Sequence, residues 1–199
     1  MQPIILASAS LQRQEYFKLL GLPFRIIPSS IDENMESGID IREAVKKLAM
    51  QKAQKVNDSL LINEQTWVVG ADTIISLDGN IFGKPKDRKD AENMIRTFCG
   101  RTHEVITGIA LLNTVKKVSD CRAIVSEVAF ADMSDSEIEW YLDTGEWEGV
   151  AGSYRIQGLA SCFITNITGS YSSIVGLPIH EFYDMLKTNG YIWQRPKSL

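Results

Sequence analysis

The sequence of 199 residues has few cysteines, no excess of positive charge and no long apolar run. Its three cysteines are odd in number and widely spaced, and no Cys-x-x-Cys pair occurs, so neither a zinc site nor a disulfide framework is indicated. We expect buried, reduced thiols in a cytoplasmic protein. No run approaches membrane-spanning length, and residues 1–7 are apolar but too short for a signal peptide. We therefore expect no membrane partner.

The charge balance argues against nucleic acid as a partner. A formal net charge of -4 gives no general attraction to nucleic acid or to anionic membranes, and no basic patch interleaved with aromatic residues occurs. A phosphate site would therefore be a local cluster of Lys and Arg. The composition, with 44% hydrophobic and 23% charged residues, is that of a globular protein, and the length predicts one domain, residues 1–199.

Residues 68–75 join two β-branched apolar runs, typical of a buried strand, around one carboxylate, Asp72. A buried charge is costly unless something pairs with it, and a metal ion, a lysine or a ligand is a candidate partner. Asp78-Gly79 predicts a hairpin turn that brings Lys84 back towards Asp72. This arrangement is consistent with a site for metal-bound phosphates and equally with a structural salt bridge.

The start of the chain predicts a short strand, residues 4–7, and a helix from about Leu11 to Leu20. Ser8 and Ser10 are favourable residues just before a helix, and such a start turns backbone N–H groups towards an anion. Arg13 in the first turn opposes the helix dipole, which makes sense beside an anion. The alternative is a solvated arginine on the surface.

Residues 40–56 form the clearest helical pattern, with an apolar stripe at helical spacing. Lys52 falls on that stripe. It either extends its ammonium to the edge of the apolar surface or points into a cleft beside Asp72. The acidic pair Asp32-Glu33, in a predicted loop, is by itself weak support for a metal site.

The rest of the chain predicts helices over residues 87–98 and 134–144, strands over 102–112 and 121–131, and a last helix from Leu177-Pro178. His103 is a candidate acid or base, although a lone histidine is more often a hydrogen-bonded structural residue. Gln157 lies in a glycine-rich stretch, residues 145–176. Its amide could hydrogen-bond a uracil or thymine edge, and the alternative is a loop amide with local partners.

Taken together, these segments resemble the Maf family of nucleoside triphosphate pyrophosphatases over nearly the whole chain. Each motif alone is weak, whereas their joint order and spacing are specific. The motifs are Leu6-Ala7-Ser8-Ala9-Ser10 with Arg13, Gly70-Ala71-Asp72-Thr73, Gly83-Lys84-Pro85, residues 100–108, residues 151–158, and residues 169–178.

The resemblance implies an α/β fold, related to the inosine triphosphatases, with a long bent mixed β-sheet flanked by helices and two lobes around a central cleft. It implies a cytoplasmic, usually dimeric enzyme that needs a divalent cation, Mg²⁺ or Mn²⁺. The substrate would be a pyrimidine or modified nucleoside triphosphate, hydrolysed to the monophosphate and pyrophosphate. Asp72 would be the general base, Asp72 and Glu33 would hold the metal, and the phosphates would be bound by Ser8, Arg13, Lys52 and Lys84.

One subgroup of the family acts on dTTP and UTP, and Thr73 and Gln157 match its pattern. Leu11 and Gln12 depart from it, because the subgroup has Pro and Arg there. We therefore expect dTTP and UTP as substrates, with Gln12 beside the substrate. Two other classes of function remain open: a nucleotide-binding regulator of cell division or septum formation with little turnover, and, less consistent with the charge, a nucleic-acid-binding protein.

Overall fold

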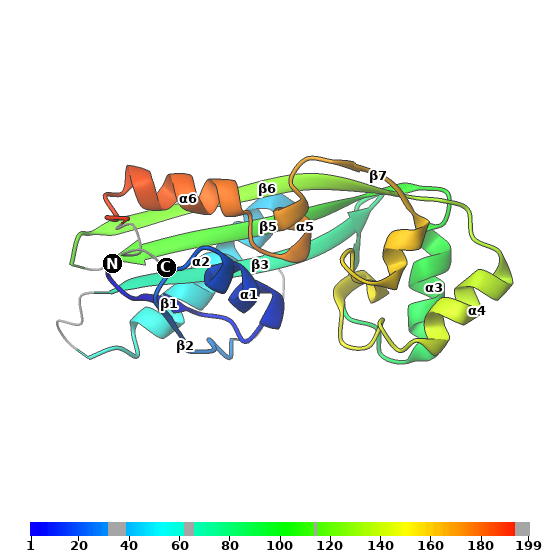
Figure 1. Ribbon diagram of the computed structural model, residues 1–199, viewed down its shortest axis with the longest axis horizontal. Helices are drawn as coiled ribbons and strands as arrows, with labels where there is room; N and C mark the ends of the chain where they lie inside the picture. The colour runs from blue at the N-terminus through cyan, green and yellow to red at the C-terminus, as the bar shows by residue number, and fades with distance from the viewer. Residues whose placement is uncertain (32–38, 62–65, 114, 194–199) are drawn as a thin grey trace. The chain divides into compact units, whose positions relative to one another are not determined.

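The computed structural model describes residues 1–31, 39–61, 66–113 and 115–193, and within these ranges the predicted mixed α/β fold is confirmed (Figure 1). The strands are β1 (Ile4–Leu6), β2 (Phe24–Ile26), β3 (Trp67–Leu77), β4 (Asn80–Phe82), β5 (Thr102–Asn113), β6 (Val118–Phe130) and β7 (Ile164–Thr168). The helices are α1 (Leu11–Leu19), α2 (Ile41–Asn57), α3 (Arg88–Phe98), α4 (Asp135–Asp143), α5 (Tyr171–Val175) and α6 (Ile179–Thr188), with short 3₁₀ helices η1 (Ala151–Ser153) and η2 (Leu159–Phe163).

The described strands form one seven-stranded mixed sheet with the order β2-β1-β3-β5-β6-β7, and β4 pairs with the far end of β3. β1 runs parallel to β2 and β3, with Leu6 opposite Val69. The β3–β4 and β6–β7 pairs are antiparallel. The predicted hairpin turn is confirmed, because Asp78 and Gly79 both have positive φ, the backbone conformation that such a two-residue turn requires.

The chain divides into two compact units, and the division falls within β3, between Asp72 and Thr73. Unit 1 comprises residues 1–72, 107–124 and 176–199, and unit 2 comprises residues 73–106 and 125–175. The prediction of one domain over residues 1–199, like that of a cleft between two lobes, stays a prediction.

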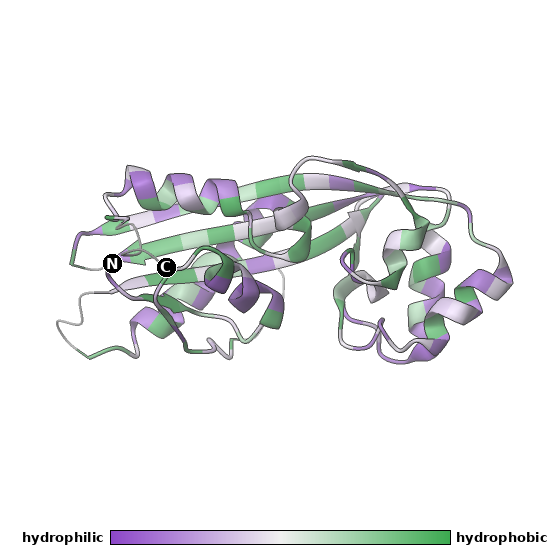
Figure 2. Ribbon diagram, viewed as in Figure 1, coloured by the Kyte–Doolittle hydropathy of each residue, from purple (hydrophilic) through white to green (hydrophobic). Residues whose placement is uncertain are grey.

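Unit 1 buries apolar side chains on both faces of its part of the sheet. On one face, α1 and α6 meet through Phe17 and Phe182, whose ring centroids are 5.2 Å apart, over β1 and β3. On the other face, α2 packs through Ala49 and Ala53. Burial on both faces explains why these strands read as continuous apolar runs rather than as alternating patterns, and Figure 2 shows the corresponding green segments on β3 and β5.

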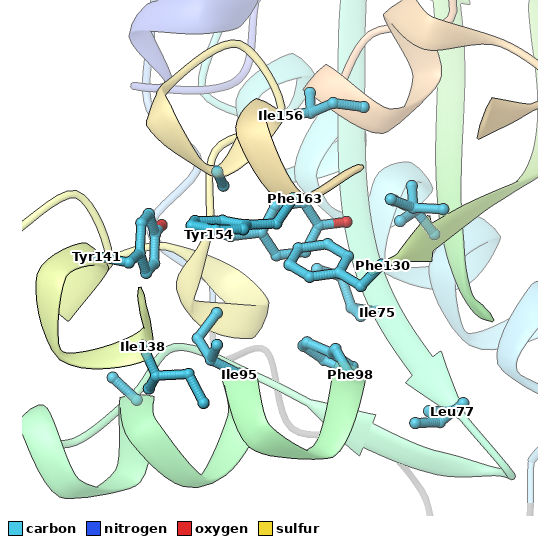
Figure 3. Close-up of a cluster of buried hydrophobic side chains, with 14 of the residues drawn as sticks. Ile75, Leu77, Ile95, Phe98, Phe130, Ile138, Tyr141, Tyr154, Ile156 and Phe163 are labelled. Atoms are coloured by element: carbon cyan, nitrogen blue, oxygen red, sulfur yellow. The ribbon is translucent and has the colours of Figure 1, made fainter. Parts of the chain in front are cut away.

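Unit 2 has its own core, drawn in Figure 3, in which α3 and α4 face the aromatic residues of the β5–β6 region and of the glycine-rich stretch. Ile95, Phe98 and Phe130 lie in this core, with Tyr154 and Phe163 from the glycine-rich stretch. A capping box begins α4: the Ser134 hydroxyl accepts from the Glu137 amide, and the Glu137 carboxylate accepts from the Ser134 amide.

The main differences from the expected elements lie in the glycine-rich stretch, where β7 and α5 were not predicted. Residues 165–168 of β7 are exposed, so this edge strand lacks the apolar face that would reveal it. The expectation of buried thiols is also wrong for Cys162, which is exposed, whereas Cys99 and Cys121 are partly buried; all three are free. No helix in the described ranges has the length and apolar character needed to span a membrane.

Candidate functional site

The main polar feature of unit 1 is an ion pair between Lys52 of α2 and Asp72 of β3. The Lys52 Nζ donates to Asp72 Oδ1 over 2.6 Å, and each residue is only 7% exposed. Of the alternatives for Lys52, the position beside Asp72 is therefore confirmed, whereas the cleft that this alternative included stays a prediction. A carboxylate offers about four lone-pair sites on its two oxygens, so the bond from Lys52 leaves Asp72 capacity to accept a proton or bind a cation.

Two glycines explain how α2 comes close enough for this pair to form. A Cβ on Gly70 would overlap the carbonyl oxygen of Ala49, and a Cβ on Gly108 of β5 would overlap that of Val45. Both contacted carbonyls belong to α2. Because side chains alternate along a strand, Asp72 lies on the same face as Gly70 and is directed towards the helix, where Lys52 is one turn beyond Ala49.

The loop from β1 to α1 forms a second polar cluster in unit 1. Arg13 is 8% exposed; its Nη1 donates to Ser8 Oγ over 2.9 Å and its Nε donates to the carbonyl of Gly176 over 2.8 Å. The alternative of a solvated arginine is wrong. The Ala7 N–H donates to the Val69 carbonyl over 2.8 Å, so the β1–α1 loop follows the end of the strand pairing that precedes Asp72 on β3.

The start of α1 also fixes Gln12, the residue that departs from the subgroup pattern. Ser10 caps the helix by accepting from the Arg13 N–H, over 3.5 Å, and its hydroxyl donates to Gln12 Oε1 over 3.1 Å. Ser10 therefore engages the oxygen of the Gln12 amide. Leu11, the other departure, is 69% exposed.

The remaining predicted site residues belong to unit 2 or lie outside the described ranges. Thr73 directly follows Asp72 on β3 and is half-buried, whereas Lys84 and Gln157 are exposed. Gln157 occupies a turn in which the Gly158 N–H donates to the Arg155 carbonyl over 3.0 Å. Glu33 falls within residues 32–38, outside the described residues. The roles of these residues in binding stay predictions.

His103 is a structural residue of unit 2. It is 1% exposed, its ring stacks on Phe98 at 4.3 Å between centroids, and its Nε2 lies 2.7 Å from the hydroxyl of Tyr154. Burial lowers the pKa of His103 to about 4 and raises the pKa of Tyr154 well above its usual range. Both groups are therefore neutral near pH 7, which fits the structural alternative and not a charged acid.

The described side chains offer few ligands for a divalent cation. Among the described residues, no three His, Cys, Asp or Glu side chains gather into a metal site. Mg²⁺ commonly uses one or two carboxylates and takes its other oxygens from phosphates and water. Asp72, a carboxylate with one oxygen engaged by Lys52, fits that sparse requirement, and Glu33 is the predicted second ligand.

Sequence reasoning missed three features of the two units. Nothing near Arg13 indicates that its guanidinium binds the carbonyl of Gly176, 163 residues later. The partnership of His103 with Tyr154 was also not predicted. Gly70 and Gly108 did carry a signal, because a glycine inside an apolar strand often marks a close approach of another backbone.

The chain is similar to known proteins along nearly its whole length. The family described as "Maf-like protein" matches residues 3–189 of the chain. The dTTP/UTP pyrophosphatase of Desulforamulus reducens is 45% identical over 190 residues, which cover 96% of this chain and 98% of that protein. The dTTP/UTP pyrophosphatase of Ruminiclostridium cellulolyticum is 42% identical over 189 residues, with 94% and 96% covered.

Solved structures give a weaker match. The Ham1 protein of Staphylococcus aureus has 13% sequence identity and a TM-score of 0.42, with 66% of this chain and 73% of that chain covered. A nucleoside-triphosphatase, dITP/XTP pyrophosphatase, of Mycobacterium abscessus has 13% identity and a TM-score of 0.40, with 66% and 75% covered.

Proposed function

Because the chain belongs to the Maf family, we propose that it hydrolyses dTTP and UTP to the nucleoside monophosphate and pyrophosphate. Relatives at 40–45% identity over nearly the whole chain carry the name dTTP/UTP pyrophosphatase. The observation that carries the proposal is the buried Lys52–Asp72 pair, because it holds a carboxylate in a fixed position that suits a general base.

The burial of this pair supports a chemical role. Taking two charges out of water costs several kcal/mol per ion, and well-packed apolar residues of similar volume are often as stable or more stable. Stability alone therefore gives little reason to keep Lys52 and Asp72. A general base that removes the proton of an attacking water gives a reason, because that step requires a fixed carboxylate.

Each residue then has a role in the reaction. Asp72 accepts a proton from the water that attacks the α–β phosphoanhydride. Lys52 fixes the direction of the Asp72 carboxylate and also takes part in binding the phosphates. Arg13, with Ser8 and the N-terminal turn of α1, binds the negative charge of the phosphates. Lys84 binds a further phosphate oxygen, and Thr73, Gln157 and Gln12 contact the nucleoside.

The proposal includes a divalent cation, Mg²⁺ or Mn²⁺, held by Asp72 and Glu33. When bound, the cation would neutralise phosphate charge and lower the pKa of a coordinated water. The enzyme is further proposed to be a cytoplasmic homodimer that acts on free nucleotides and binds neither nucleic acid nor a membrane.

A panel of nucleoside triphosphates tests the proposal. Purified protein is incubated with dTTP, UTP, CTP, GTP or 7-methyl-GTP and with Mg²⁺ or Mn²⁺, and pyrophosphate release is measured. We expect dTTP and UTP to give the highest kcat/KM. A preference for a purine triphosphate would overturn the substrate assignment. Tight binding of UTP with no turnover under either metal would favour the nucleotide-binding regulator instead.

A further inference from the structure

The turn that carries Gln157 lies against a carboxylate that the reaction does not use. Glu146 accepts from the N–H of Leu159 with both oxygens, Oε1 at 3.1 Å and Oε2 at 2.8 Å. A Cβ on the intervening Gly158 would overlap the same carboxylate. The Glu146 carboxylate therefore rests directly on the backbone that follows Gln157.

The end of α4 places Glu146 beside the Leu159 N–H. Gly145 has a φ of 72° and donates its N–H to the carbonyl of Leu142 over 3.2 Å, which is a typical glycine-terminated helix end. The chain then turns at Gly145, and Glu146 is the next residue. Gly158, which precedes η2, has no side chain to cap this 3₁₀ helix, and Glu146 supplies the missing acceptor from another segment.

The other end of the same segment is held by the core of unit 2. Tyr154 is 4% exposed and its hydroxyl contacts His103, while Ile156 is 5% exposed within the same cluster (Figure 3). Residues before Gln157 are thus fixed by the core, and Glu146 fixes the backbone immediately after it, before the chain returns to the same core at Ala160. Without Glu146, the Leu159 N–H would lose its acceptor, and residues 157–159 would be held only through their neighbours in the core.

Gln157 itself depends on this support. Its side chain is exposed, and across the described parts of the chain it has no side-chain hydrogen-bond partner. The backbone of the turn therefore sets the position from which the Gln157 side chain extends. We propose that Glu146 is a positioning residue that holds the Ile156-Gln157-Gly158 turn so that Gln157 distinguishes uracil and thymine from other bases.

This inference rests on the proposed function, and it assigns the selectivity for the base to a carboxylate that touches no substrate. It predicts a change in KM and selectivity rather than in the chemical step. Glu146→Ala is compared with Glu148→Ala, the matched control, because Glu148 is an exposed glutamate two residues further on. Kinetics with UTP, dTTP, CTP and GTP give KM and kcat for each variant.

We expect Glu146→Ala to raise KM for UTP and dTTP about fivefold to tenfold, the effect of one lost hydrogen bond, with kcat little changed. The ratio of kcat/KM for UTP to that for CTP should fall. Glu146→Gln retains an oxygen acceptor and should restore most of the selectivity. Hydrogen exchange should show a faster Leu159 amide in Glu146→Ala, with the amides of α3 unchanged.

Gly158→Ala gives an independent route to the same defect, because its new Cβ would displace the Glu146 carboxylate, the far end of a flexible side chain. The double variant of Glu146→Ala and Gly158→Ala should then be no worse than the more impaired single variant. Independent, multiplying effects would contradict a shared mechanism.

These measurements distinguish a failure of the positioning role of Glu146 from a failure of the proposed function. If the wild type prefers UTP and dTTP but Glu146→Ala matches Glu148→Ala in KM and selectivity, the positioning role is wrong and the proposed function stands. An equal rise in KM for all four triphosphates would also overturn it, since it would show a general loss of binding. If the wild type releases no pyrophosphate from UTP or dTTP, the proposed function fails, and the role of Glu146 fails with it.

Discussion

Each of the two units has a buried pair of polar side chains that can be compared directly. In unit 1, Lys52 and Asp72 are 2.6 Å apart and form an ion pair. In unit 2, His103 and Tyr154 are 2.7 Å apart, and burial moves both of their pKa values in the direction that keeps them neutral. The surroundings also differ, because His103 and Tyr154 are enclosed by the rings of Phe98 and Phe130.

This difference in charge separates a buried pair with a chemical role from one with a structural role. A neutral pair inside an aromatic cluster forms its hydrogen bond without burying a charge, and of this pair only His103 Nδ1 is left buried without a partner among the described residues. A buried ion pair is weaker support for stability, because desolvation offsets much of its attraction. We therefore assign a catalytic role to the Lys52–Asp72 pair and a structural role to the His103–Tyr154 pair. The following variants test this difference.

The largest effect is expected at Asp72. Asp72→Asn retains the shape of the side chain and removes its basicity, so turnover should fall at least ~10²-fold, the usual scale for the loss of a general base. Binding of UTP should survive, as measured by calorimetry on folded protein. Near-normal turnover per folded molecule would remove Asp72 from the mechanism.

The same pair offers a matched control for stability. Lys52→Met leaves Asp72 buried without its partner and should cost about 3–5 kcal/mol of unfolding free energy. The double variant with Lys52→Met and Asp72→Leu should regain most of that loss and remain inactive. If the double variant stayed as unstable as the single one, the pair would be a stabilising element.

His103 should appear in the pH dependence of stability and not in turnover. The unfolded chain binds a proton on His103 below about pH 6.5, whereas the folded protein keeps the ring neutral down to about pH 4. The stability that His103 contributes is therefore complete above pH 6.5 and is lost as the pH falls from 6.5 to about 4.

Urea unfolding at pH 7 and pH 4.5 measures this effect against His103→Gln, which stays neutral throughout. The wild type should lose on the order of 2 kcal/mol more than His103→Gln over that interval. Parallel losses in the two proteins would show that the His103 ring is protonated in the folded state.

Gly70→Ala tests whether close packing of α2 creates the ion pair. The new Cβ would overlap the carbonyl of Ala49, and overpacking of this kind typically costs about 1–3 kcal/mol. Turnover per folded molecule should also fall, because α2 carries Lys52 away from Asp72. Gly83→Ala is the stability control, since a Cβ there meets nothing within 4 Å. A fall in stability with turnover unchanged would separate helix packing from catalysis.

Arg13 and Lys84 should differ although both are proposed to bind phosphate. A phosphate-binding residue that is exposed to solvent should contribute little to stability. Arg13 differs, because it is 8% exposed and bonds to the Gly176 carbonyl, so Arg13→Ala should lower the melting temperature as well as raise KM. Lys84 is exposed, and Lys84→Ala should change stability by less than about 0.5 kcal/mol. Equal thermal stability of the two variants would contradict this distinction.

The smallest effect is expected at Gln12. A hydrogen bond to a charged group contributes about 1.5–3 kcal/mol, compared with about 1 kcal/mol for a neutral one. Gln12→Arg should therefore raise kcat/KM for dTTP and UTP severalfold without changing the preferred base. Lower kcat/KM, or a shift towards purine triphosphates, would show that Gln12 belongs to a different base pocket.

The sequence predicts the family, most helices and strands and the importance of Asp72, because these depend on local patterns. The partner of Asp72 could not be settled in this way. Periodicity places Lys52 on the apolar face of α2, but the pair forms only because Gly70 and Gly108 allow the helix to approach the sheet. The burial of Arg13 similarly depends on Gly176, far away in the sequence.

Elements without an apolar face are equally hard to predict. β7 is an edge strand with one half-buried and four exposed residues, so its sequence carries no alternating pattern. The support of Gln157 by Glu146 joins a helix end to a 3₁₀ start thirteen residues later, and nothing in either segment alone indicates the contact.

The central proposal is that the protein cleaves the α–β phosphoanhydride with Asp72 as the base. The direct measurement is ³¹P NMR of the products formed from UTP by the wild type and by Asp72→Asn, with Mg²⁺ or Mn²⁺ present. We predict UMP and pyrophosphate from the wild type and almost no product from Asp72→Asn in the same time. UDP and inorganic phosphate from the wild type, or equal rates for the two proteins, would contradict it.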